Sequence, residues 1–316
     1  MKINSGKYFL FLMIPFLFSC GKKKMELTFT ELASGVSTDL NGIAGGGVFY
    51  VVGGTRYEES TILGGPAYWT EQFVDVQKAV YRVDAYGLNN AAAVALDGKI
   101  IITRNQGANW EVHQSFMWRP LRGIDWVNDS FIVAVGGVGF SHSQLEVSRD
   151  GGNTWQEDTT LPGELRDVEF VNSTTGFACG YGVIYKTTDG AHTWIPTEAK
   201  GDFFTGIDFI DENYGFVCGY NGSILKTSDG GEHWEKIRNG NNIFKSHYRF
   251  NDIAANAGFG YAVAEDGIMI WFDSKENQIR LVKDVPHFNI RGIFIGESNH
   301  GTIVGSVGKI YDFTGN

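Results

Sequence analysis

Short runs of alternating apolar and polar residues, separated by turn residues, predict that the chain is built from β-strands. The clearest unit has four such runs, at residues 165–171, 176–181, 183–188 and 193–197. The next unit copies this order at residues 205–210, 214–220, 223–228 and 233–237. The last unit stops after its third strand, residues 309–314, and we expect residues 26–32 to supply the fourth strand and cover an exposed edge.

The turn before the fourth strand carries a recurring motif. It is nearly complete at residues 148–155, 187–194 and 227–234, and residues 103–110 carry Asn in place of Asp. The carboxylate is placed to accept hydrogen bonds from the amides of its own turn, glycine supplies a positive φ, and a closing Trp packs into the sheet. We therefore assign structural roles to four residues: Asp150, Asp189, Asp229 and Asn105.

The motif recurs about every 40 residues, which is the repeat length of a four-stranded propeller blade. Weaker copies of the spacing extend it to seven positions: residues 64, 105, 150, 189, 229, 273 and 312. The pattern predicts an all-β fold, a seven-bladed β-propeller of four-stranded blades over residues 26–316. Residues 26–32 would close its ring.

The N-terminal segment has the features of a signal sequence. Lys2 and Lys7 precede an apolar run at residues 8–18, and Ser19 leads into Cys20. This arrangement resembles a bacterial lipoprotein signal, which implies a signal peptide over residues 1–19, lipidation of Cys20 and a tether over residues 20–25. An ordinary secretory signal or an uncleaved anchor are the alternatives. The resemblance implies a lipid-anchored protein of the cell envelope, and Gly21 after Cys20 favours the outer membrane over the inner.

Composition excludes several classes of function. The formal net charge of -10 argues against nucleic acid as a partner. Cys179 and Cys218 occupy equivalent positions in consecutive repeats, too far apart for a disulfide, and we interpret both as small buried residues between blades. The sequence has no dinucleotide fingerprint, phosphate-binding loop or zinc spacing, so we expect neither a cofactor nor a metal.

The starts of the first strands offer a candidate binding face. Aligning these strands places seven residues in one register: Asn41, Lys78, Arg122, Arg166, Thr205, Asn251 and Arg291. Four of the seven are basic in an acidic chain, so a closed ring would focus positive potential on an anionic partner. Alternatively, the side chains only satisfy strand-end carbonyls and nearby acids such as Asp167. The loops entering this face add candidate anchors: Trp118, Arg119, Phe204, Tyr248 and Phe288.

Residues 205–210 and 222–231 carry a family resemblance. The Asp-containing repeats resemble the Asp-box, or BNR, repeats of sialidases and extracytoplasmic propellers. Within that group, residues 123–236 most resemble the photosystem II stability and assembly factor-like family. The resemblance implies a propeller that binds other proteins during assembly of a membrane complex.

An enzymatic alternative would place its own demands on the same residues. A sialidase-like glycoside hydrolase needs an arginine cluster, a tyrosine nucleophile backed by a carboxylate, and an acid. The Arg-Ile-Pro element that accompanies Asp boxes in sialidases is missing, and no catalytic residue can be assigned. A lectin that stacks sugars on its aromatic residues is a third reading. We therefore expect a non-catalytic scaffold for an envelope complex, with a protein as partner and a glycan as the alternative.

Overall fold

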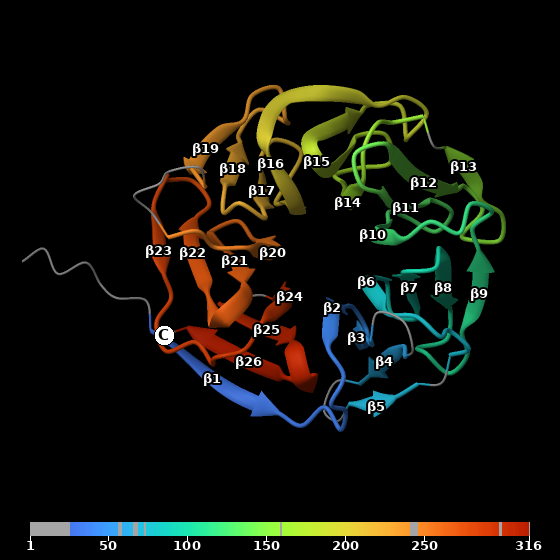
Figure 1. The fold of residues 1–316 in the computed structure, drawn as a ribbon, viewed down its shortest axis with the longest axis horizontal. Coiled ribbons are helices and arrows are strands. Elements are labelled where there is room, and N and C mark those ends of the chain that lie inside the picture. The colour runs from blue at the N-terminus through green and yellow to red at the C-terminus, as the bar shows by residue number, and fades with distance from the viewer. Residues whose placement is uncertain are drawn as a thin grey trace, which may run out of the picture.

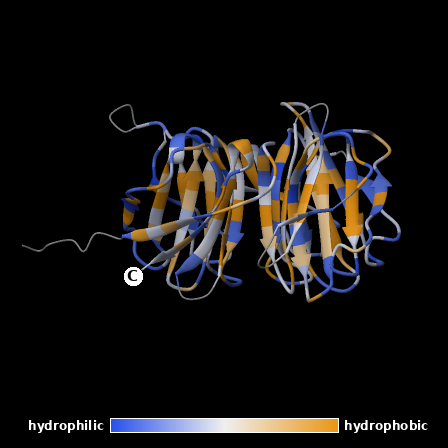
Figure 2. Ribbon diagram, turned by 90° about the horizontal axis from the view of Figure 1, so that it is seen from below, coloured by the Kyte–Doolittle hydropathy of each residue, from blue (hydrophilic) through white to orange (hydrophobic). Residues whose placement is uncertain are grey.

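Antiparallel sheets stand around a central axis, and each four-stranded sheet runs from an inner strand at the axis to an outer strand at the rim (Figure 1). The computed structural model describes residues 26–315 except 56–58, 66–68, 73, 159, 241–245 and 297–298. Seen from the side, the strands run between the two faces of a thick disc (Figure 2). The proposed signal peptide, the tether and Cys20 lie outside the described residues.

Three four-stranded sheets form the first part of the ring. The first contains β2 (Leu40–Gly45), β3 (Phe49–Gly53), β4 (Thr61–Gly64) and β5 (Thr70–Glu71). The second contains β6 (Val80–Tyr86), β7 (Asn90–Ala95), β8 (Lys99–Thr103) and β9 (Glu111–Gln114). The third contains β10 (Leu121–Trp126), β11 (Ile132–Val138), β12 (His142–Ser148) and β13 (Gln156–Asp158).

The rest of the ring has one large sheet and two four-stranded sheets. The large sheet contains β14 (Leu165–Phe170), β15 (Gly176–Thr187), β16 (Ile195–Phe209), β17 (Gly215–Gly219), β18 (Ile224–Thr227) and β19 (Glu235–Arg238). The next contains β20 (Phe250–Ala255), β21 (Phe259–Ala264), β22 (Met269–Asp273) and β23 (Ile279–Leu281). The last contains β24 (Ile290–Ile295), β25 (His300–Gly305), β26 (Ile310–Gly315) and β1 (Leu27–Leu32). Two short 3-10 helices, η1 (Glu265–Gly267) and η2 (Ser306–Gly308), complete the described elements, none of which is a helix that could cross a membrane.

The expectation of seven separate four-stranded blades is wrong. Counting each hydrogen-bonded sheet as a blade, the residues that the structure describes form six blades: five of four strands and one of six. Two elements of this sheet each join two strands that the sequence predicted separately. Strand β15 joins those at 176–181 and 183–188, and β16, a strand of 15 residues, pairs with β15 through residues 195–203 and with β17 through residues 204–209. Elsewhere an irregular connection separates the fourth strand of a repeat from the next first strand. Here the backbone stays extended from Ile195 to Phe209, so two sequence repeats share one sheet.

The ring closes as the strand pattern predicted. Strand β1 pairs antiparallel with β26, in register from Leu27 opposite Gly315 to Leu32 opposite Ile310. Glu31 reinforces this pairing, because it forms an ion pair with Lys309 and accepts a 3.0 Å hydrogen bond from the Tyr311 hydroxyl. The closing strand therefore covers the edge that β26 would otherwise expose.

The cores lie between neighbouring sheets. Phe177 and Phe209 stack with ring centroids 4.3 Å apart in one such cluster, which also contains the closing Trp234. Cys179 and Cys218 are fully buried free thiols in two of these clusters, which confirms their interpretation as packing residues. Apolar burial between sheets is thus the main stabilising contribution to the ring.

The four motif turns have the geometry that the sequence predicted. In the turn at Asp189, one carboxylate oxygen accepts hydrogen bonds from the Thr193 amide at 2.9 Å and from the Thr187 hydroxyl at 2.8 Å. The other oxygen accepts from the Thr193 hydroxyl at 2.6 Å. In the other three turns, the side-chain oxygen of Asp150, Asp229 or Asn105 accepts the equivalent hydrogen bond, from the amide four residues further along the chain. The motif residues are therefore structural components of their own turns.

We expect Asp189→Ala to lower the melting temperature, because the turn amides and hydroxyls lose their shared acceptor. Glu71→Ala, which removes an exposed carboxylate from edge strand β5, is the matched control and should leave the transition unchanged. Scanning calorimetry of both variants checks this. Equal transitions for the two variants would contradict the structural role of the motif.

Candidate binding site at the channel mouth

The inner strands carry one bulged residue each, at the same end of the ring. The pairing register of each inner strand shifts at this point, as between Leu121 and Gly123 of β10. The bulged residues are Asn41, Tyr81, Arg122, Arg166, Thr205, Asn251 and Arg291. A bulge frees a side chain from the alternation of the sheet and re-aims it. Here all seven side chains line one cavity of about 550 Å³ at the mouth of the channel.

Three of the four basic residues that the alignment placed in one register lie at the mouth, and one does not. Arg122, Arg166 and Arg291 line the cavity, but Lys78 is not among its lining residues. Lys78 precedes β6, and Tyr81 occupies the bulge position in that strand. Three cations of the predicted four therefore meet at the mouth.

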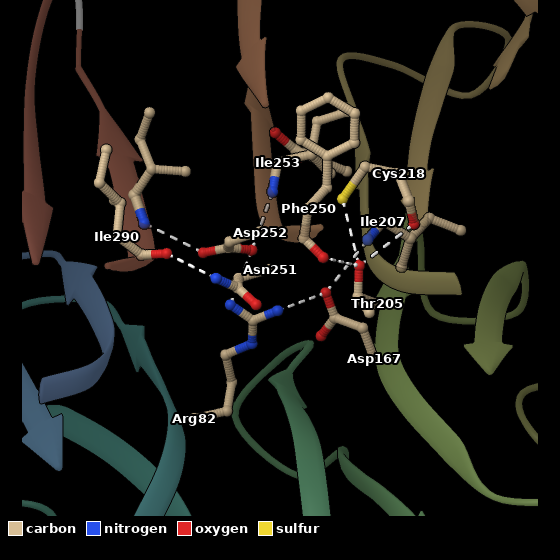
Figure 3. A network of polar contacts seen from close by, with 12 residues as sticks. Arg82, Asp167, Thr205, Ile207, Cys218, Phe250, Asn251, Asp252, Ile253 and Ile290 are labelled. Atoms are coloured by element: carbon tan, nitrogen blue, oxygen red, sulfur yellow. Dashed lines mark hydrogen bonds and ion pairs between the residues drawn. The ribbon is translucent and has the colours of Figure 1, made fainter. Parts of the chain in front are cut away.

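Three of the bulged residues connect neighbouring inner strands through side-chain hydrogen bonds. The Asn41 side chain donates to the Val80 carbonyl at 3.0 Å, and Asn251 donates to Ile290 at 2.7 Å. The Thr205 hydroxyl donates to the Phe250 carbonyl at 2.9 Å; Figure 3 shows the latter two contacts. The structural alternative, satisfaction of strand-end carbonyls, is therefore correct for these polar residues.

The arginines form a different arrangement, in which Arg122 and Arg166 share one carboxylate. Their Nε atoms lie 3.4 and 2.9 Å from the same oxygen of Glu164, and neither Nε makes a hydrogen bond to a described residue. Burial, followed by the charge of Arg122, lowers the pKa of Arg166 to about 10. Two guanidinium groups against one carboxylate leave a surplus positive charge at this wall of the cavity.

Aromatic rings hold these guanidinium groups in place. Arg122 lies over the Tyr81 ring at 4.2 Å, and Arg166 lies over the Phe203 ring at 4.5 Å. On the other side of the mouth, Arg291 donates to Asp39 at 2.6 Å and to Asn41 at 3.0 Å. Arg291 is thus neutralised by its own partner, and the surplus charge belongs to the Arg122 and Arg166 pair.

The predicted anchor residues have different environments, and none lines the cavity. Trp118 is 65% exposed in the loop between β9 and β10, and Arg119 donates to the Ser143 carbonyl at 3.1 Å. Phe204 is fully buried in a core cluster. Tyr248 is half-buried beneath Arg238, and Phe288 packs against Tyr311. Whether they contact a partner remains a prediction.

The aromatic residues that line the cavity are Tyr81, Phe203 and Tyr220, and none of them is among the predicted anchors. Phe203 is the neighbour of the predicted Phe204. Successive side chains of β16 point to opposite faces of the strand, so only one of Phe203 and Phe204 can point into the core. The burial of Phe204 therefore leaves Phe203 facing the mouth.

Below the mouth, a buried arginine bridges the channel. Arg82 forms ion pairs of 2.8 Å with both Asp167 and Asp252, whose side chains are 9% and 6% exposed (Figure 3). Burial opposes the charge of Arg82, but the two carboxylates outweigh it and raise its pKa. One cation therefore ties β6 to inner strands on other parts of the ring.

The deeper channel, a cavity of about 320 Å³, is lined with carboxylates that join the inner strands. Asp84 accepts a hydrogen bond from the Trp126 amide at 2.7 Å, Asp125 from Phe170 at 2.6 Å and Asp208 from Ala255 at 2.5 Å. Asp167 and Asp252 accept similarly from Ile207 and Ile293. Each bond links one inner strand to a neighbouring one. The described residues contain no cluster suited to a metal ion.

These carboxylates give stability an unusual pH dependence. Burial raises the pKa of Asp84 and Asp167 to about 6 and that of Asp208 to about 7. A raised pKa means that the folded chain holds the proton more tightly, so this stabilisation is complete below about pH 4 and is lost as the pH rises through 6 to 7. The turn carboxylates act oppositely: hydrogen bonds from Thr154 lower the pKa of Asp150 to about 2, so its contribution is lost in acid.

We expect the free energy of unfolding to fall as the pH rises from 5 to 8. The variant Asp208→Asn should make this fall smaller, because it removes a titrating carboxyl group and keeps an acceptor for the Ala255 amide. Urea titrations across this range measure both. Stability that rises steadily to pH 8 would show that the channel carboxylates are ionised in the folded chain.

Comparisons with known proteins agree with this architecture. Residues 191–315 match the family model described as photosynthesis system II assembly factor YCF48, which confirms the resemblance inferred from the repeats. No curated protein matches the chain in sequence.

Solved structures share its fold. A structure of YCF48 bound to D1 peptide is 15% identical, with a TM-score of 0.70, over 92% of this chain and 97% of that one. YCF48 from Cyanidioschyzon merolae is 14% identical, with a TM-score of 0.70, over 90% and 98%. A streptogramin B lyase is also 14% identical, with a TM-score of 0.72, over 92% and 98%. The chain is therefore a β-propeller whose residues 191–315 are similar in sequence to the photosystem II assembly factor YCF48.

Proposed function

We propose that this protein is a non-catalytic binding module that holds a protein segment at its channel mouth during assembly or maintenance of a membrane-associated complex. The observation that carries the proposal is the pair Arg122 and Arg166, which share the single carboxylate of Glu164 at the wall of a 550 Å³ cavity. The similarity to YCF48, one structure of which holds a D1 peptide, supports a protein as the partner.

The chemistry of the mouth suits a carboxylate on that partner. A guanidinium group presents paired donors that match the two oxygens of a carboxylate. The cavity is walled by low-dielectric aromatic rings, so a charge–charge interaction there is stronger than on an open surface. An incoming carboxylate would neutralise the surplus positive charge that Glu164 leaves at this wall.

The co-purification experiment compares three forms of the tagged protein isolated from native membranes in mild detergent. The wild type is compared with Arg122→Gln/Arg166→Gln and with Arg104→Gln/Arg149→Gln, whose arginines lie at the motif turns on the opposite face. We expect one protein to accompany the wild type and the opposite-face variant but not the mouth variant. Recovery with all three folded forms would exclude the mouth as the binding site.

The proposal includes a lipid anchor at Cys20, which would hold the propeller at an envelope membrane, with the outer membrane as the expected site. Metabolic labelling with an alkyne fatty acid should label the wild type and leave Cys20→Ser unlabelled. Cys179→Ser, which changes a buried thiol, is the control that should retain the label. Equal labelling of the wild type and Cys20→Ser would rule out the anchor.

A further inference from the structure

Four aromatic rings form a continuous arc beside the channel mouth. Phe140 and Tyr181 lie 4.1 Å apart between ring centroids, Tyr181 and Phe203 lie 5.3 Å apart, and Phe203 and Tyr220 lie 6.4 Å apart. They come from the β11–β12 turn, β15, β16 and the turn after β17. We call this set the aromatic arc.

The aromatic arc is open to solvent although its rings are apolar. Phe140 is 75% exposed, Tyr181 39% and Tyr220 38%. Large apolar side chains grouped on a surface mark sites of interaction, whereas isolated ones need no explanation. Gly163, at φ +83°, lies beside Tyr181, because a Cβ at this position would be 3.5 Å from the Tyr181 Cβ. The group therefore has the exposure of a docking surface.

The aromatic arc begins inside the cationic cavity and leads out of it. Phe203 and Tyr220 line the cavity, and Tyr181 and Phe140 continue the row of rings beyond its lining. Arg166 lies over Phe203 at 4.5 Å, and Arg249 lies over Tyr220 at 5.2 Å. A single molecule lying along this path would meet positive charge at its inner end and apolar rings toward its outer end.

The geometry points to an extended peptide as the occupant, in which a carboxylate sits at Arg122 and Arg166 and nearby large apolar side chains lie on the aromatic arc. This inference rests on the proposed function and adds the sequence character of the partner segment. The row of rings corresponds to at most roughly five residues of extended chain at about 3.3 Å per residue. The carboxylate can come from an acidic side chain or from a chain terminus.

A peptide fits these contacts better than a membrane does. The inner half of the aromatic arc lies on the wall of a concave cavity, which a bilayer surface cannot enter. Side chains of an extended peptide can enter it, because they project alternately and leave the backbone at the opening. Arg166 lies at the inner end of the path, so the occupant needs an anionic group at that end only, which one carboxylate of a peptide supplies.

The test uses unlabelled ten-residue Gly-Ser peptides and isothermal titration calorimetry. One peptide has only a free terminal carboxylate, and a second adds Phe at the third and fifth residues from that end. A third keeps both Phe residues with a terminal amide and an internal Asp, and a fourth has Phe residues and the amide but no acid. We expect the two Phe-and-acid peptides to bind about tenfold more tightly than the peptide with carboxylate alone. The ratio of their two dissociation constants shows whether a terminal carboxylate or an Asp side chain is preferred.

The variant Phe140→Ser/Tyr181→Ser should abolish the Phe advantage and leave binding of the carboxylate-only peptide unchanged. The single change Phe140→Ser, at a 75% exposed position, should reduce the advantage without affecting the fold. Leu88→Ser, at a 73% exposed position in the β6–β7 turn, is the matched control and should bind every peptide as the wild type does.

The outcomes separate this inference from the proposed function. Equal affinity of the wild type for the peptides with and without Phe would overturn the role of the aromatic arc, while binding that still required Arg122 and Arg166 would leave the proposed function standing. No acid-dependent binding of any peptide would count against both. Binding of neutral phospholipid vesicles that is lost in Phe140→Ser would make the aromatic arc a membrane contact and overturn the inference.

Discussion

Arg82→Met should destabilise the propeller by about 3–5 kcal/mol, the usual cost of leaving a buried carboxylate without its cation. Arg82 is 15% exposed and is the shared partner of Asp167 and Asp252, so its removal leaves two buried carboxylates facing each other across the channel. Methionine fills a similar volume, which limits the loss of packing. We expect the melting temperature to fall by roughly 10 °C.

Urea unfolding at pH 7 measures the loss, and two further variants identify its cause. Arg104→Met breaks a more exposed ion pair with Glu111 and should cost less than about 1 kcal/mol. Adding Asp167→Asn and Asp252→Asn to Arg82→Met should recover much of the lost stability, because no buried charge is left unpaired. A cost below about 1 kcal/mol for Arg82→Met alone would show that the bridge does not hold the ring together.

Arg122→Gln/Arg166→Gln should weaken binding of the captured partner segment by about 100-fold, since each arginine at the centre of the site should contribute about 1.4 kcal/mol. Either single change should cost about tenfold, and the two effects need not add, because both residues share Glu164. The loss should shrink at high salt. Titration calorimetry at two salt concentrations measures these differences.

Glu164→Gln tests the sign of the charge effect. It removes the carboxylate that Arg122 and Arg166 share and retains an acceptor for the Gly139 amide, which Glu164 binds at 3.0 Å. The positive surplus then rises, so we expect binding to become several times tighter. Weaker binding through Glu164→Gln, with the fold intact, would indicate that the two arginines serve only to position that carboxylate.

Sequence patterns predicted the features that depend on neighbouring residues. Asp189 contacts only residues of its own turn, so its role could be recognised locally. The closure by β1 followed from the missing fourth strand of the last repeat. The number of sheets did not follow, because the repeat spacing cannot show that the backbone of β16 stays extended between two repeats.

The site was predicted less completely, because its contacts connect distant parts of the chain. Arg82 and Asp167 are 85 residues apart, and pairing at that separation has no local signal. The repeat alignment places Lys78 where the structure has Tyr81, because β6 has Arg82 at the position after the bulge where β2 and β10 have glycine. A stricter alignment on the apolar residue before each bulge would have found both Tyr81 and Arg82.

Photo-crosslinking tests the location of partner binding most directly. A benzoylphenylalanine at Tyr220, on the cavity wall, is compared in native membranes with the same residue at Leu88, in the β6–β7 turn at the far end of β6 from its bulge. If the channel mouth holds a protein segment, irradiation will give a discrete adduct from position 220 and none from position 88. An adduct from position 88 alone would place partner binding on the opposite face and contradict the proposed function.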